Sequence, residues 1–175
     1  QEAMQHINTY DKKHANTAAQ LEEAINSLDQ KTTEYLVSIS KQSLSGHDSK
    51  VHNILLENIR DIERIGDHVE NLFELTEFIE NNGAQLSEEA MQELNGMLEL
   101  VVETVSLAIQ SLDQLDVEVA KQVLANEDKI DHMERKLRKH HIVRLNDGIC
   151  TGSAGVIFID LISNLERVGD HAANI

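Results

Sequence analysis

The sequence has no proline and no tryptophan, and only five of its 175 residues are aromatic. Without proline, no residue forces a break in a long helix, and the scarcity of aromatic residues argues against a sheet protein. A single cysteine, Cys150, excludes an internal disulfide and any zinc site that needs several thiolates. Lys and Arg number 15 against 31 Asp and Glu, and the resulting net charge of −16 repels a nucleic-acid backbone. We therefore expect an all-α protein that does not bind nucleic acid.

Long apolar runs are missing as well, although a membrane-spanning helix needs about 20 such residues. The longest candidate, residues 154–162, is short and contains Asp160. The chain begins with Gln1 rather than Met, and it stops at Ile175 inside a helical pattern. We expect it to be a fragment or a trimmed piece of a longer protein, so that any membrane segment would lie outside it.

Helix start signals and apolar spacing divide the chain into six expected helices. The expected spans are residues 2–9, 12–43, 49–80, 88–112, 117–145 and a last helix from 154 to the end. The side chains expected to cap their N-termini are Asp11, Asp48 or Ser49, Ser87, Asp116 and Ser153.

The second half of the chain repeats the first. A shift of 105 positions pairs residues 21–29 with 126–134, and a shift of 103 pairs residues 62–68 with 165–171. The difference of two falls in an intervening loop, where insertions are tolerated. We therefore expect two tandem three-helix repeats, residues 1–82 and 83–175, which together form one antiparallel bundle.

Each repeat carries two acids and a glycine in its last helix. The first has Glu63, Gly66 and Asp67, and the second has Glu166, Gly169 and Asp170. Acids four positions apart lie on the same side of a helix, where like charges destabilise it unless something compensates. A glycine inside a helix costs about 1 kcal/mol relative to alanine. Its presence in both repeats indicates a steric need, namely the close approach of another backbone or of a ligand.

A second acidic pair, Glu127 and Asp131, lies on the helix before the last one. In an antiparallel hairpin this pair faces Glu166 and Asp170, and four converging carboxylates require protonation or a cation. Oxygen ligands suit several metals, so that iron, manganese, magnesium, calcium and zinc all stay open. The first repeat has Glu22 and Asn26 at the corresponding positions. Because Asn26 is uncharged, we expect the first site to be the weaker one.

Three other interpretations compete with a metal site. In the first, the acids only form ion pairs with Arg60, Arg64 and Arg167, and the protein is a passive scaffold that forms homo-oligomers. In the second, it is a carboxylate-bridged di-metal oxidase, but none of the nine histidines has the Glu three positions earlier that such sites use. In the third, the basic stretch from Arg135 to Arg144, which includes His140 and His141, contacts anionic headgroups or an acidic partner, whereas a solvated helix face explains it better. Two further histidines, His68 and His171, directly follow the repeated Asp. We expect them to face solvent or to support the metal ligands.

The repeated segments 62–72 and 165–175 resemble the signature of PhoU-like phosphate-transport regulators, and the likeness extends over the whole chain. Residues 141–146 and 155–162 further resemble the cytoplasmic PhoU-like tail of bacterial type II-related sodium/phosphate cotransporters. That resemblance implies a transporter portion in the same polypeptide, before Gln1, and a location at the cytoplasmic face of the cell membrane.

The family resemblance implies a regulatory domain without enzymatic activity that controls phosphate uptake. It also implies metal ions at the acidic motifs, in some members iron. On this chain those motifs are Glu63/Asp67, Glu127/Asp131 and Glu166/Asp170, whereas Glu22/Asn26 departs from the pattern. The alternative within the family is a free-standing regulator that acts with a phosphate ABC transporter and its sensor kinase.

Overall fold

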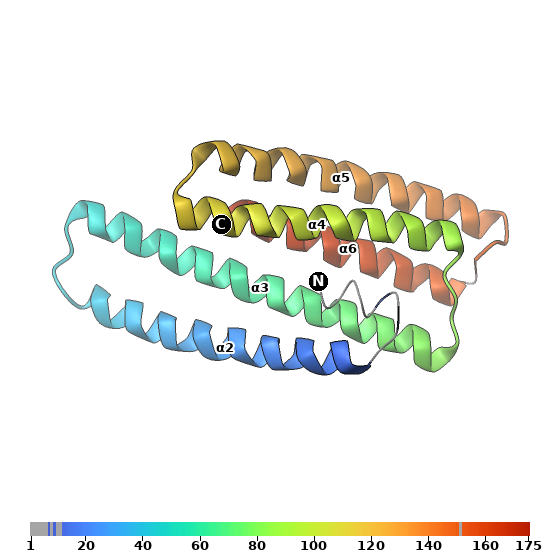
Figure 1. The fold of residues 1–175 in the computed structure, drawn as a ribbon, viewed down its shortest axis with the longest axis horizontal. Coiled ribbons are helices and arrows are strands. Elements are labelled where there is room, and N and C mark those ends of the chain that lie inside the picture. Colours follow the sequence, from blue (N-terminus) through green and yellow to red (C-terminus); the bar gives the residue numbers. More distant parts are fainter. Residues whose placement is uncertain (1–6, 8, 10–11, 151) are drawn as a thin grey trace.

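The computed structural model describes Ile7, Thr9 and residues 12–150 and 152–175. These residues form helices and no strand. The helices are α2 (Lys12–Ser40), α3 (Gly46–Asn82), α4 (Glu88–Gln114), α5 (Val117–Asn146) and α6 (Gly152–Asn174). Figure 1 shows them lying side by side along one long axis, each antiparallel to the one before it.

The all-α class is confirmed, but the expectation of six helices was wrong: the described part of the chain contains five. The expected first helix, residues 2–9, lies outside the described residues except for Ile7 and Thr9, which are both helical.

Local chemistry explains most of the helix boundaries. Ser87 and Asp116 cap α4 and α5 as expected, and the carboxylate of Asp116 accepts a hydrogen bond from the Glu118 amide at 2.8 Å. The cap of α3 is Ser45 rather than Asp48 or Ser49. Because its hydroxyl already accepts from the Asp48 amide, α3 begins earlier than expected. The last helix likewise begins at Gly152, before the expected cap Ser153.

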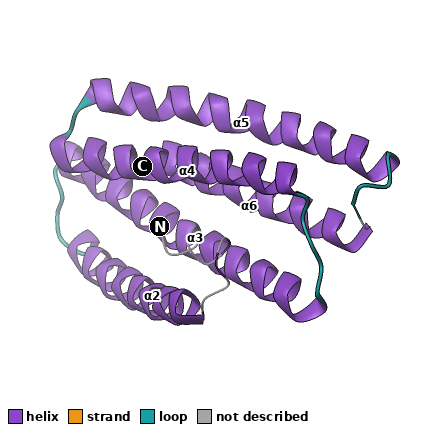
Figure 2. Ribbon diagram, turned by 45° about the vertical axis from the view of Figure 1, so that its right-hand side comes forward, coloured by secondary structure: helices purple, strands orange, loops and turns teal. Residues whose placement is uncertain are grey.

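The core is concentrated in the second half of the chain. Helices α4, α5 and α6 all contact one another, α6 also packs against α3, and α2 joins the assembly through α3 (Figures 1 and 2). Completely buried side chains come mainly from the α4–α5–α6 bundle: Leu94, Met97, Ile130, Leu137, Phe158, Leu161, Ile162 and Leu165. Helix α6 is therefore the central element, because it belongs to that bundle and also contacts the first half.

A groove lies between the two halves of the chain. In the second half, α4 packs on both α5 and α6. Among the described residues, side chains of α2, α3, α4 and α6 line this groove, which has a volume of about 670 Å³. In the described part of the chain, no helix combines the length and the apolar content needed to cross a bilayer.

Candidate metal centre

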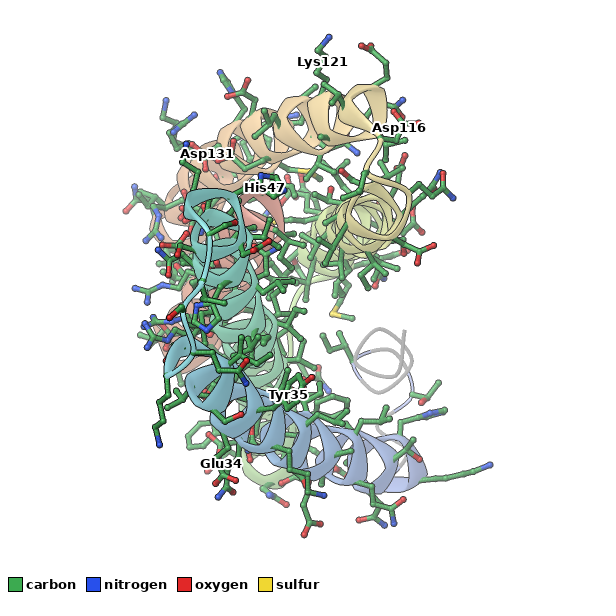
Figure 3. The ribbon with its side chains drawn as sticks, turned by 90° about the vertical axis from the view of Figure 1, so that its left-hand side faces the viewer. Glu34, Tyr35, His47, Asp116, Lys121 and Asp131 are labelled. Atoms are coloured by element: carbon green, nitrogen blue, oxygen red, sulfur yellow. The ribbon has the colours of Figure 1, made fainter. Side chains whose placement is uncertain are left out.

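The α5–α6 packing brings three of the predicted ligands together. One carboxylate oxygen from each of Glu127, Asp131 and Asp170 lies within 4.8 Å of the other two. Glu127 and Asp131 occupy successive turns of α5, and Asp170 lies in the last turns of α6 (Asp131 is labelled in Figure 3). Such a group of carboxylate oxygens can coordinate a hard divalent cation.

Electrostatics show that these carboxylates are unfavourable as free anions. Burial raises the pKa of Glu127, and the nearby charges of Asp131 and Asp170 raise it further. The pKa of Glu166 is raised by burial first, then by Asp170 and Asp131, so the fourth predicted ligand lies beside the same group. Burial also raises the pKa of Asp170, followed by the charge of Asp131, although His171 acts in the opposite direction. A bound cation would counteract these rises in pKa, because a nearby positive charge favours the ionised carboxylate.

The protein itself supplies little positive charge to this cluster. Arg135 forms an ion pair with Asp131 at 3.1 Å, but the arginine side chain is 55% exposed. An exposed pair of this kind contributes little stability. Among the described residues, Arg60, Arg64 and Arg167 form no ion pair with any acid, so the ion-pair interpretation was wrong for these three.

The first half arranges its acids more loosely. Burial raises the pKa of Glu63, and the charges of Asp67, Asp29 and Glu22 raise it further, so these groups share one seam between α2 and α3. The side-chain amide of Asn26 donates a hydrogen bond to Glu22. Within the described residues, no first-half group of three carboxylates meets the distance found around Asp170. The residues present therefore fit a cation better in the second half.

The repeated glycines lie where the expected helix hairpins pack. A Cβ atom on Gly169 would lie 3.0 Å from Cδ1 of Ile130 on α5, and one on Gly66 would lie 3.7 Å from Cδ1 of Ile25 on α2. At Gly169 the structure therefore leaves little room for a larger residue, as the repeat predicted. The close neighbour is the side chain of Ile130, whereas the prediction was a backbone or a ligand. At Gly66 the same space holds an ordinary van der Waals contact.

Sequence reasoning missed two acids near these sites, Asp29 and Glu134. They occupy equivalent positions in the two repeats, seven residues after Glu22 and Glu127. Asp29 raises the pKa of Glu63, and Glu134 raises that of Glu166. The signal was available, because positions i, i+4 and i+7 share one helix face. Glu134 also forms an ion pair with Arg138.

His68 and His171 are partly buried and stack on one another between α3 and α6, so they do not face open solvent. That they support metal ligands stays a prediction. The expectation of a solvated helix face around His140 and His141 was wrong. His141 and Arg144 are not part of a solvated face, since they are 1% and 3% exposed. Arg144 donates to Glu93 of α4 at 2.7 Å and lies over the ring of Phe158. Two side chains of the basic stretch are thus buried near the end of α5.

A family model described as the PhoU domain matches residues 1–76 and 94–175 of the chain. The phosphate-specific transport system accessory protein PhoU homolog 1 of Thermotoga maritima is 31% identical over 121 residues, covering 69% of this chain and 51% of that protein. A PhoU homolog of the same description from a Burkholderia species is 23% identical and covers 99% of this chain and 74% of that protein. The chain thus spans about half the length of the Thermotoga relative.

Two solved structures share the fold. PhoU from Pseudomonas aeruginosa superposes with a TM-score of 0.90 at 20% identity, over 99% of this chain and 82% of that one. The phosphate transport system regulatory protein PhoU from Streptococcus pneumoniae gives a TM-score of 0.85 at 21% identity, over 99% and 80%. At these identities the likeness establishes the fold alone.

Proposed function

The chain belongs to the PhoU domain family, and on that premise we propose that it is a regulatory domain of a phosphate transport system that binds metal ions through its acidic motifs. It acts by binding rather than by catalysis. The second-half centre is the stronger site, with Glu127, Asp131, Glu166 and Asp170 as ligands. The first-half site, built from Glu22, Asn26, Glu63 and Asp67, is the weaker one.

The family match over both repeats is the observation that supports the regulatory role. The names of the relatives describe accessory proteins of phosphate-specific transport systems. They favour a PhoU-type regulator that works with such a system over the tail of a sodium/phosphate cotransporter. The metal assignment is supported separately, by three carboxylate oxygens within 4.8 Å of one another and by the raised pKa values of Glu127, Glu166 and Asp170.

The regulatory role is tested in a bacterium whose own PhoU gene is deleted and which carries a reporter driven by a phosphate-starvation promoter. We expect the chain to restore the dependence of the reporter on external phosphate. A chain that accumulates as a folded protein but leaves the reporter unresponsive would contradict the proposal.

The metal centre is tested by elemental analysis of protein purified without chelators. We expect bound metal in the unmodified chain and a loss of most of it in the Glu166→Gln/Asp170→Asn variant. The matched control is Glu99→Gln/Glu103→Gln, which removes two exposed acids at the same spacing on α4. Equal metal content in all three proteins would remove the assigned ligands, whatever the reporter shows.

A further inference from the structure

Two histidines meet where the two halves of the chain pack together. His68 of α3 and His171 of α6 stack with their ring centroids 5.5 Å apart and their planes 18° from parallel. Both rings are partly buried, and the His171 side chain is 17% exposed. Helices α3 and α6 pack directly against each other.

Each ring is held by an oxygen atom from the opposite helix. Nδ1 of His68 bonds to Oδ1 of Asn164 at 3.0 Å, and Nδ1 of His171 bonds to Oδ1 of Asp61 at 2.8 Å. These oxygens accept hydrogen bonds, so the neutral rings carry their proton on Nδ1 and a free lone pair on Nε2.

The orienting oxygens are themselves held in place by the same pattern in both halves. Asn71 of α3 donates to Asn164, and Asn174 of α6 donates to Asp61. The shift of 103 that relates the repeats turns one of these arrangements into the other. The two rings are therefore positioned by a repeated network and not by an incidental contact.

The remaining ring nitrogens are available to a ligand. Among the described residues, the buried side-chain nitrogens that lack a partner all belong to His141 and Arg144. Within the same residues, neither Nε2 of His68 nor Nε2 of His171 has a hydrogen-bond partner. Neither atom is therefore completely buried.

We propose that His68 and His171 form a binding site for a transition-metal cation of the Zn²⁺ or Cu²⁺ class, with Nε2 of each ring as a ligand. Imidazole nitrogen suits these ions, and metal-binding histidines usually donate their other ring N–H to a carboxylate or carbonyl oxygen. Asp61 and Asn164 take that positioning role. Water fills the other coordination positions.

The geometry sets a condition on this site. Two metal–nitrogen bonds of about 2.1 Å place the two Nε2 atoms no more than about 4.2 Å apart. The ring centroids lie 5.5 Å apart, so binding one ion requires the Nε2 edges of the two rings to tilt toward each other. The site differs chemically from the acidic centre, because its ligands are nitrogen atoms. A bound ion would join α3 of the first half to α6 of the second and stabilise their contact.

The test adds less than one equivalent of Cu²⁺ to the metal-free chain and records the electron paramagnetic resonance spectrum. We expect hyperfine splitting from two imidazole nitrogens in the unmodified protein. His68→Gln and His171→Gln should each lose this signature and bind Cu²⁺ at least tenfold more weakly. Asp61→Leu should weaken binding about 10–100-fold, because it removes the orienting oxygen but keeps both ligands.

Two controls separate this site from others. His47→Gln removes an exposed histidine at the start of α3 (labelled in Figure 3) and should change nothing. Glu127→Gln/Asp131→Asn disables the acidic centre from α5 and should leave the two-nitrogen signal intact. A wild-type spectrum without two coupled nitrogens, or one unchanged in His68→Gln and His171→Gln, would overturn the proposal. The wild-type spectrum decides the matter even where a variant fails to fold.

Discussion

Gly169 of α6 lies so close to Ile130 of α5 that a Cβ atom on the glycine would come within 3.0 Å of Cδ1 of the isoleucine. The equivalent glycine of the first repeat, Gly66, would place its Cβ atom 3.7 Å from Ile25. Both glycines sit inside helices and both are buried. The same motif thus meets a tight neighbour in one half and an ordinary contact in the other.

This asymmetry predicts that alanine substitution at the two glycines changes stability to different extents. Gly66→Ala should raise the free energy of unfolding by about 1 kcal/mol, because alanine favours the helix and its methyl group meets only van der Waals contacts. Gly169→Ala should gain less or lose stability, since Ile130 is itself buried and has little room to move. Urea unfolding of the two variants measures the difference. Equal stabilisation by both substitutions would show that Ile130 can move aside at the α5–α6 contact without loss of stability.

Removing charge from the acidic centre should stabilise the metal-free protein. Glu166→Gln/Asp170→Asn relieves a like-charge pair one turn apart, which should raise the free energy of unfolding by about 0.5 kcal/mol. In excess Mn²⁺ the order should reverse. The unmodified protein should gain about 2.7 kcal/mol at a hundredfold excess over the dissociation constant of the second-half centre. The variant should lose most of this gain and keep only the contribution of the weaker first-half site. The Glu99→Gln/Glu103→Gln control should retain the full Mn²⁺ response.

The same centre should give the metal-free protein an unusual pH dependence. The pKa values of Glu127, Glu166 and Asp170 are raised in the folded state, so the folded protein binds more protons than the unfolded chain just above pH 4. Their contribution to stability should therefore increase as pH falls from 7 through the raised pKa values, and level off near pH 4. Subtracting the unfolding free energy of Glu166→Gln/Asp170→Asn at each pH isolates this effect. A flat difference between pH 4 and 7 would contradict it.

The sequence predicted the parts of this structure that depend on local chemistry. Ser87 and Asp116 cap their helices because a side-chain oxygen next to a free amide needs no tertiary context. The meeting of Asp170 with Glu127 and Asp131 followed from the one-turn spacing of acids and an antiparallel hairpin. Both inferences need only helical periodicity and the order of the helices.

What could not be predicted depends on contacts between residues far apart in the chain. Arg144 looks like part of a charged helix face, and its burial is decided by Glu93 on α4 and Phe158 on α6. The stacking of His68 on His171 likewise requires the packing of α3 against α6, which no pattern within either helix specifies. The one sequence signal for this network is that Asn164 and Asn174 of the second repeat occupy the positions equivalent to Asp61 and Asn71 of the first.

The ion pair between Glu93 and Arg144 should respond asymmetrically to substitution. Arg144 is 3% exposed, and its Nε and Nη2 atoms already lack partners. Glu93→Leu would leave the buried guanidinium with only the exposed carboxylate of Glu89, 3.8 Å away, and should cost about 3 kcal/mol. The double variant Glu93→Leu/Arg144→Leu removes both charges and should recover most of this loss. Denaturant unfolding of the unmodified protein, Glu93→Leu, Arg144→Leu and the double variant forms the cycle, and additive losses of the two single variants would show that the pair is not coupled.

His141 should make the protein sensitive to mild acid. Its ring is 1% exposed and stacks on Phe158, and within the described part of the chain neither ring nitrogen has a hydrogen-bond partner. Burial lowers the pKa of His141, and the adjacent charge of Arg144 lowers it further, although Glu93 acts in the opposite direction. The folded state therefore favours the neutral ring, and the stability it confers is complete above the unfolded pKa of about 6.5.

Below pH 6.5 the unfolded chain takes up a proton at this position that the folded protein resists. Stability should then fall by up to about 1.4 kcal/mol per pH unit until the lowered pKa of His141 is reached. This sign is opposite to that of the acidic centre, so the two effects separate only by comparison of variants. His141→Leu replaces the imidazole with an apolar side chain of similar size and should lack the loss of stability that His141 causes between pH 6.5 and 5. His47→Leu, at an exposed position, should retain that loss. If His141→Leu and the unmodified protein lose stability in parallel over that range, the buried imidazole is not the group that responds to acid.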